Sequence, residues 1–126
     1  MDSIWTETEK AVHFAPLKGN RNTDVLIIGG GIAGILCAYK LKNTGVDCTL
    51  VEAGEICGGI TKNTTAKITL QHGLIYDKVI RRFGENKARL YAEAQKGAIN
   101  EYARLCREID CNYETRDSYV YALDDR

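Results

Sequence analysis

The segment at residues 29–34 reads G-G-G-I-A-G and holds glycines at the spacing G-x-G-x-x-G, namely Gly29, Gly31 and Gly34. In such a segment the first glycine permits a tight turn, and the second lets a phosphate group approach the backbone. The third allows the following helix to pack closely on the preceding strand. Because the N–H groups that begin a helix attract anions, this spacing predicts a pyrophosphate site. The alternative is a glycine-rich turn that binds no ligand.

A carboxylate, Glu52, follows Gly34 by 18 residues, at the expected end of the next strand. A carboxylate in this place can accept hydrogen bonds from both hydroxyls of an adenosine ribose. Its negative charge would repel a 2′-phosphate. We therefore expect the site to disfavour NADP.

A second glycine pair, Gly58 and Gly59, lies shortly after Glu52, and three threonines follow it: Thr61, Thr64 and Thr65. This polar segment can return to the dinucleotide and offer backbone N–H groups and hydroxyls to phosphate or ribityl oxygens. The alternative is an ordinary surface loop. Cys57, beside the glycine pair, is interpreted as a packed thiol.

The elements around the glycine motif predict a strand, a helix and a second strand. Val25–Ile28 is a continuous apolar run of the kind that suits a strand covered on both faces. Apolar residues then recur at helical spacing from Ile32 to about Asn43, and Gly45 follows where a left-handed residue would end the helix. Val46–Val51 is the second strand. The fold class is therefore α/β, built on a βαβ unit over residues 24–52.

The remaining segments are expected to be less regular at first and then helical. Residues 1–23 predict an irregular arm, and residues 53–73 predict a loop because they are rich in glycine and threonine. Leu74–Phe83 predicts a short helix, and residues 85–109 predict a long amphipathic helix. The run D-S-Y-V-Y-A-L at residues 117–123 predicts a strand.

Length and composition limit the classes of function. The chain has 126 residues, 44% of them hydrophobic and 27% charged, which is typical of one globular domain or part of one. The formal net charge is zero, so we expect neither nucleic acid nor an anionic membrane as partner. No segment is apolar enough to span a membrane, and no secretory signal begins the chain, so a cytoplasmic location is expected. Five cysteines without a C-x-x-C pair predict no metal site.

Residues 24–59 resemble the N-terminal FAD-binding signature of the two-dinucleotide-binding-domain flavoproteins, and within them the D-amino-acid oxidase and glycine oxidase type of FAD-dependent oxidoreductase. The runs S-I-W, F-A-P-L and T-K-N-T-T-A-K-I-T are similar to a subgroup whose longer members often end in a Rieske iron–sulfur domain. Enzymes of this family run to several hundred residues. The resemblance therefore implies a Rossmann-like FAD-binding unit, with additional helices and the start of a substrate domain. Residues 24–126 would be the N-terminal part of an incomplete FAD/NAD(P)-binding domain.

The resemblance also implies roles for individual residues around FAD. Gly29, Gly31 and Gly34 would lie at the pyrophosphate, with Gly30 beside them in the turn. Glu52 would lie at the adenosine ribose, with Ala53 next to it. The family's loop would meet the pyrophosphate and ribityl chain at Gly59, Ile60 and Thr61, and the flavin ring at Thr65, Ala66 and Lys67. No catalytic residue can be carried over, because the family's substrate contacts come mostly from later parts of the chain.

The activity that the resemblance implies is oxidation of a small amine, amino acid or hydroxy acid by hydride transfer to flavin. One alternative is an amine-oxidase or desaturase-like flavoprotein, although that group commonly has Arg where this chain has Ile60. Another is a non-catalytic FAD-binding fragment or subunit. The expected partners are a small-molecule substrate of the full-length protein and either a missing C-terminal half or a second copy paired along the strand at 117–123.

Overall fold

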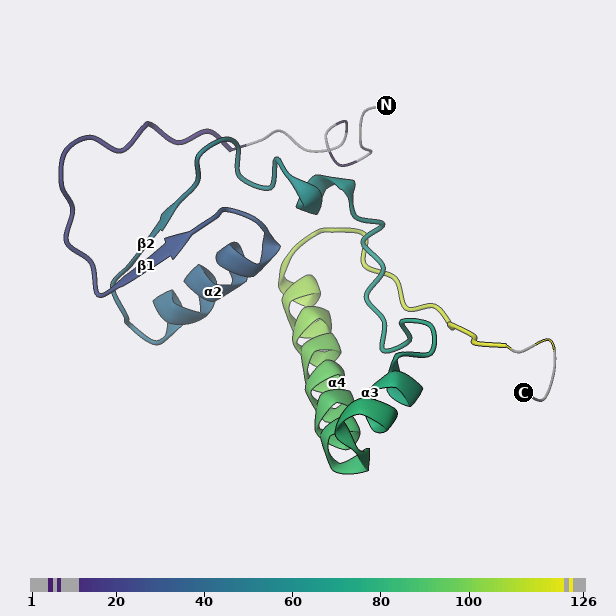
Figure 1. The fold of residues 1–126 in the computed structure, drawn as a ribbon. Coiled ribbons are helices and arrows are strands. Elements are labelled where there is room, and N and C mark those ends of the chain that lie inside the picture. Colours follow the sequence, from purple (N-terminus) through teal and green to yellow (C-terminus); the bar gives the residue numbers. More distant parts are fainter. Residues whose placement is uncertain (1–4, 6, 8–11, 122, 124–126) are drawn as a thin grey trace. The chain divides into compact units, whose positions relative to one another are not determined.

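The structure is a computed structural model that describes residues 5, 7, 12–121 and 123 of the chain. The chain divides into two compact units, Met1–Ala66 and Lys67–Arg126. In the described part of the chain, the first unit includes two strands, the helix between them and a 3₁₀ turn, and the second unit includes two helices (Figure 1).

A parallel pair of strands forms the centre of the first unit. Strand β1 (Val25–Ile28) pairs with β2 (Cys48–Val51), with Val25 opposite Cys48 and Ile28 opposite Val51. Helix α2 (Ile32–Asn43) connects them and packs against both strands (Figure 1). The predicted strand–helix–strand unit is confirmed, and the second strand begins two residues later than predicted.

Helix α2 ends in the way that its sequence predicts. The N–H group of Thr44 donates to the carbonyl oxygen of Leu41 at 3.0 Å, and the N–H group of Gly45 donates to that of Lys42 at 3.1 Å. Gly45 has a φ of 78°, in the left-handed region that glycine adopts at little cost. The chain can therefore leave the helix at once and enter β2.

Helix α2 approaches β1 most closely at Gly34. A Cβ atom at this position would collide with the carbonyl oxygen of Gly29 and would lie 3.4 Å from Cγ2 of Ile27. Gly29 itself has a φ of 107°, which only glycine adopts readily. Close packing of the helix on the strand at the third glycine, as predicted, is confirmed.

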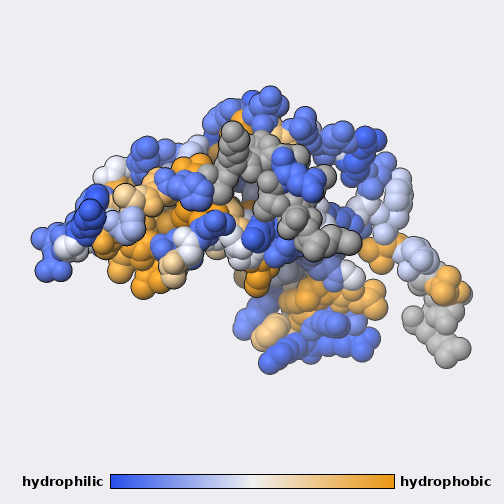
Figure 2. All heavy atoms as spheres, turned by 90° about the horizontal axis from the view of Figure 1, so that it is seen from above, coloured by the Kyte–Doolittle hydropathy of each residue, from blue (hydrophilic) through white to orange (hydrophobic). Residues whose placement is uncertain are grey.

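The two faces of β1 differ in how well they are covered. Side chains alternate along β1, and Leu26 and Ile28 are 55% and 82% exposed, whereas Val25 and Ile27 are half-buried. Hydrophobic residues accordingly reach the surface (Figure 2). The prediction that β1 is covered on both faces is wrong for the described residues. The reason is that one helix can cover only one side of a sheet this narrow.

The segment after β2 is irregular, as predicted, apart from one 3₁₀ turn at Ile60–Asn63. It is attached to the glycine turn, because the N–H group of Cys57 donates to the carbonyl oxygen of Gly30 at 2.9 Å. The predicted arm at 1–23 is irregular over residues 12–23, and positions 1–4, 6 and 8–11 lie outside the described residues. The indole Nε1–H of Trp5 donates to the carbonyl oxygen of Thr64 at 2.9 Å.

The second unit is a pair of packed helices, α3 (Ile75–Phe83) and α4 (Glu85–Glu108). Gly84 joins them with a φ of 81°, which allows the chain to reverse within one residue. The rings of Tyr76 and Tyr91 meet edge to face at 6.0 Å between their centroids. Both predicted helices are confirmed to within one residue at each end. In the described part of the chain, no helix combines the length and the apolar character needed to cross a membrane.

The predicted strand at residues 117–123 is wrong over the part of it that can be compared. Residues 117–121 have neither strand nor helix structure, and residue 122 lies outside the described positions. Tyr119 and Tyr121 are more than four-fifths exposed. A strand needs a neighbour to accept its ladder hydrogen bonds, and the described residues offer this segment none. The expected self-association along this segment stays a prediction.

We predict that Gly34→Ala lowers the free energy of unfolding by about 1–3 kcal/mol, because the added methyl group forces α2 away from β1. The matched control is Gly97→Ala in α4, where the new methyl group meets no atom within 4 Å. That control should raise stability by about 0.5–1 kcal/mol, since alanine is the better helix former. Urea unfolding measures both effects. Wild-type stability in Gly34→Ala would contradict the packing described here.

Candidate functional site

The turn between β1 and α2 presents backbone N–H groups at one point. The helical hydrogen bonds of α2 begin at Ile35. Its N–H group donates to the carbonyl oxygen of Gly31 at 3.0 Å. The N–H groups of Ile32, Ala33 and Gly34 therefore precede the helical hydrogen-bond ladder. No acidic residue lies in the first turn of α2, so the partial positive charge of the helix end is not neutralised there. Such an end can bind an anion.

The carboxylate of Glu52 links this turn to the end of β2. Its Oε2 accepts a hydrogen bond from the N–H group of Gly30 at 2.7 Å, and its Oε1 accepts one from the N–H group of Gly54 at 2.9 Å. The Gly30 N–H group, then that of Gly54 and to a smaller degree that of Ala53, lower the pKa of Glu52 below its usual value. Glu52 is therefore ionised at neutral pH.

Gly30, which lies between the first two glycines of the motif, is also restricted by its surroundings. A Cβ atom there would lie 3.1 Å from Cβ of Glu52 and would collide with Cδ1 of Ile56. The dinucleotide motif leaves this position open to other residues. In this chain, glycine at position 30 lets the Glu52 side chain lie directly against the turn.

Thr61 brings the 3₁₀ turn to the beginning of α2. Its hydroxyl oxygen accepts a hydrogen bond from the N–H group of Ile32 at 3.1 Å. Gly31, at the N-cap position, has no side chain that could do this. The return segment therefore supplies the cap that the helix lacks, and it places a hydroxyl group at the anion-binding end of α2.

A cavity of about 250 Å³ opens where these groups meet. This volume is below the range of about 300–1,000 Å³ that is typical of small-molecule sites, so it can take only part of a dinucleotide. The residues that line the cavity are Gly31, Glu52, Glu55, Cys57, Gly58, Gly59, Ile60 and Thr61.

The structure brings together most of the residues singled out in the sequence. Five of them line the cavity, namely Gly31, Glu52, Gly59, Ile60 and Thr61. Gly29, Gly30 and Gly34 form the adjoining turn, and Ala53 follows Glu52 directly in the chain. Thr65 and Ala66 lie beyond the lining, and Lys67 belongs to the second unit. The roles of these last three near a flavin ring stay predictions.

Three lining residues were not among the predicted site residues: Glu55, Cys57 and Gly58. Gly58 had a signal, because it belongs to the second glycine pair. No pattern in the sequence marked Cys57 as a site residue. Its position depends on the tertiary structure: its backbone is left-handed, with a φ of 59°, and its N–H group donates to the carbonyl oxygen of Gly30. The thiol of Cys57 is half-buried.

Comparison with curated proteins gives relatives over most of the chain. The chain is 41% identical over 126 residues, 98% of its length, to YhfW of Bacillus subtilis (strain 168), whose provisional name is Rieske 2Fe-2S iron–sulfur protein. It is 26% identical over 119 residues, 93% of its length, to gamma-glutamylputrescine oxidoreductase of Escherichia coli (strain K12). Over 88 residues, 66% of its length, it is 35% identical to mitochondrial glycerol-3-phosphate dehydrogenase of Saccharomyces cerevisiae.

These matches cover a minor part of each relative. The chain spans 25% of the Bacillus protein, 28% of the Escherichia coli protein and 13% of the yeast protein. No solved structure gives a significant match. Residues 24–126, which include the glycine turn, Glu52 and the return segment, match the model of the FAD dependent oxidoreductase family. The chain therefore belongs to the FAD-dependent oxidoreductases, of which it represents an N-terminal FAD-binding region.

Proposed function

We propose that the cavity of the first unit holds the pyrophosphate and the adenosine ribose of FAD. One observation carries this proposal: the N-terminal end of α2, the carboxylate of Glu52 and the return segment at Cys57–Thr61 all border the same cavity. Each of them supplies a group of the kind that a dinucleotide needs, because phosphates bind to N–H donors and ribose hydroxyls to a carboxylate.

The phosphate end of the site is formed by backbone. At Gly31 a Cβ atom would meet only the hydroxyl oxygen of Thr61, at 3.3 Å, and at Gly59 it would meet no atom within 4 Å. Both glycines therefore leave room for phosphate oxygens to approach the main chain. The positive end of the α2 dipole adds an attraction that does not depend on any cationic side chain. These residues fit a pyrophosphate.

The ribose end of the site depends on Glu52. An ionised carboxylate has about four acceptor positions, and the N–H groups of Gly30 and Gly54 occupy two of them. Acceptor positions therefore remain for ribose hydroxyls. Because the carboxylate stays ionised at neutral pH, a 2′-phosphate at this point would meet a like charge, which favours FAD and NAD over NADP.

The activity that we propose for the parent protein is oxidation of a small amine, amino acid or hydroxy acid. When bound, FAD supplies the redox chemistry by accepting a hydride from the substrate carbon. The residues of this chain bind and orient the adenosine half of the cofactor. The similarity to gamma-glutamylputrescine oxidoreductase supports an amine substrate. The alternatives to this activity are an amine-oxidase or desaturase-like flavoprotein and a non-catalytic FAD-binding fragment or subunit. The cytoplasmic location stays a prediction.

Replacing Gly31 with valine tests the phosphate end. We expect Gly31→Val to weaken FAD binding at least about tenfold, equal to about 1.4 kcal/mol, because a branched side chain blocks the approach to the backbone. Isothermal titration of the purified protein with FAD measures the affinity. Gly97→Ala serves as the control that changes a glycine far along the chain in α4. Wild-type FAD affinity in Gly31→Val would refute the assignment.

Charge removal at Glu52 tests the ribose end. The wild-type protein should bind FAD more tightly than NADP, and Glu52→Gln should narrow this preference because the like-charge repulsion is gone. Glu55→Gln is the matched control, since it removes the same charge from the same cavity at a carboxylate that accepts no hydrogen bond from the glycine turn. Competitive titrations with both nucleotides give the ratios. An equal narrowing in both variants would mean that Glu52 does not select the cofactor.

The lowered pKa of Glu52 predicts a pH dependence of stability. A carboxyl group whose pKa is lower in the folded than in the unfolded state stabilises the fold fully above its unfolded pKa. This contribution is lost as the pH falls through the lowered folded pKa. Wild-type protein should therefore melt at a higher temperature than Glu52→Gln at pH 7, and the difference should shrink below about pH 4. A difference that stays constant with pH would contradict this role.

A further inference from the structure

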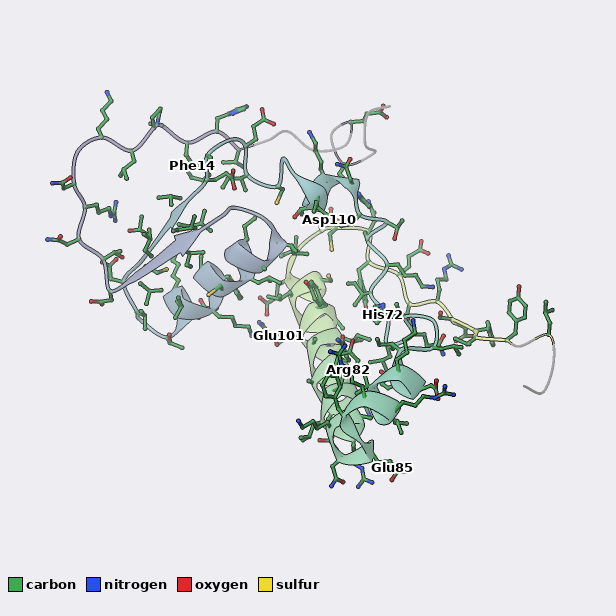
Figure 3. The ribbon with its side chains drawn as sticks, viewed as in Figure 1. Phe14, His72, Arg82, Glu85, Glu101 and Asp110 are labelled. Carbon is green, nitrogen blue, oxygen red and sulfur yellow. The ribbon has the colours of Figure 1, made fainter. Side chains whose placement is uncertain are left out.

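A side chain of the N-terminal arm, Trp5, is anchored on the segment that borders the candidate site. Its indole Nε1–H donates to the carbonyl oxygen of Thr64 at 2.9 Å, across 59 positions of the sequence. Trp5 is 40% exposed, whereas Phe14 and Leu17 further along the arm are 74% and 62% exposed. Figure 3 labels Phe14 on the arm. The arm is therefore attached to this segment at Trp5.

A path of hydrogen bonds leads from Trp5 to the beginning of α2. Thr64, which accepts from the indole, follows directly on the 3₁₀ turn at Ile60–Asn63. Its own N–H and hydroxyl groups donate to the carbonyl oxygen of Thr61 at 3.3 and 3.1 Å. The hydroxyl oxygen of Thr61 accepts from the N–H group of Ile32 at 3.1 Å. Trp5 therefore contacts the residue that closes the turn, and the turn presents the cap of the helix.

The 3₁₀ turn depends on such contacts, because apolar packing contributes little to it. Ile60, its first residue, is 86% exposed. The hydrogen bonds of a 3₁₀ turn also have poorer geometry than those of an α-helix. The N–H group of Lys62 donates to the carbonyl oxygen of Cys57 at 3.2 Å and attaches the front of the turn. Loss of the indole N–H group would leave the other end less restrained, and with it the Thr61 hydroxyl group.

We propose that Trp5 is a positioning residue for the dinucleotide: it holds the 3₁₀ turn so that the Thr61 hydroxyl group stays at the phosphate-binding end of α2. This inference rests on the function proposed above. Trp5 does not line the cavity, so it acts through Thr64 and Thr61. A site whose groups are held in place before binding loses less conformational freedom when the ligand binds, and its affinity is higher for that reason.

Replacing Trp5 with phenylalanine tests the proposal, because it removes the indole N–H group and keeps an aromatic ring. We expect Trp5→Phe to weaken FAD binding by about three- to tenfold, the range that corresponds to the loss of one hydrogen bond. Isothermal titration of the purified chain with FAD measures the affinity. Phe14→Leu is the matched control, since it changes an exposed aromatic ring of the same arm and should bind FAD as wild type does.

A double-mutant cycle distinguishes positioning from a general effect on stability. Thr61→Val removes the hydroxyl group and keeps the shape of the side chain. In this background Trp5→Phe should change the FAD affinity by less than about twofold, because its effect passes through the Thr61 hydroxyl group. The same loss of affinity with and without this hydroxyl group would overturn the inference, and so would wild-type affinity in Trp5→Phe.

Amide exchange in the ligand-free protein tests the same contact independently of FAD. Trp5→Phe should speed the exchange of the N–H groups of Thr64 and Ile32 at least about threefold. The N–H group of Gly29, which donates to the carbonyl oxygen of Val51 at 2.8 Å, should exchange as in wild type and show that the strands remain paired. Unchanged exchange at Thr64 and Ile32 would overturn the inference about Trp5 alone. Failure of the wild-type chain to bind FAD would overturn the proposed function, and with it the role of Trp5 in binding.

Discussion

The arrangement of the first unit depends on the hydrogen bond between the N–H group of Gly30 and the carboxylate of Glu52, 2.7 Å long. It joins the turn after β1 to the turn after β2, where the carboxyl ends of two parallel strands lie side by side. The other carboxylate oxygen accepts from Gly54 and so holds the second turn. Bonds between a charged acceptor and backbone donors are stronger than neutral ones. One side chain therefore ties both turns together, beside the backbone hydrogen bond from the N–H group of Gly29 to the carbonyl oxygen of Val51.

The polar groups of the site already have partners within the chain. Thr61 accepts from the N–H group of Ile32, and Glu52 accepts from the N–H groups of Gly30 and Gly54. If the N–H groups of the helix end and the carboxylate lacked hydrogen-bond partners, this geometry of the turns would be less stable. A phosphate oxygen that binds at the start of α2 has to replace or adjoin the Thr61 hydroxyl. Binding is then an exchange of similar hydrogen bonds in a site whose backbone is already in place.

The two units bury little apolar surface in their own interiors. Among the described residues only Ala88 and Leu105 are buried hydrophobics, both in α4, while Ile28 of β1 is 82% exposed. The first unit is accordingly held together by backbone pairing and by polar contacts at the turns. Exposed aliphatic side chains forgo the hydrophobic free energy that burial would supply, about 25 cal/mol per Å².

The sequence by itself determined the features that depend on neighbouring residues. The glycine spacing, the apolar run of β1 and the periodicity of α3 and α4 predict local geometry, because turns and helices are stabilised by contacts a few residues apart. Only the tertiary structure decided what depends on residues far apart in the chain. Thr61 caps α2 although it lies 29 residues from Ile32 in the sequence. Gly30 has no side chain and so leaves room for those of Ile56 and Glu52. The run at 117–121 has strong strand propensity and still forms no strand, because a strand is completed by its neighbour.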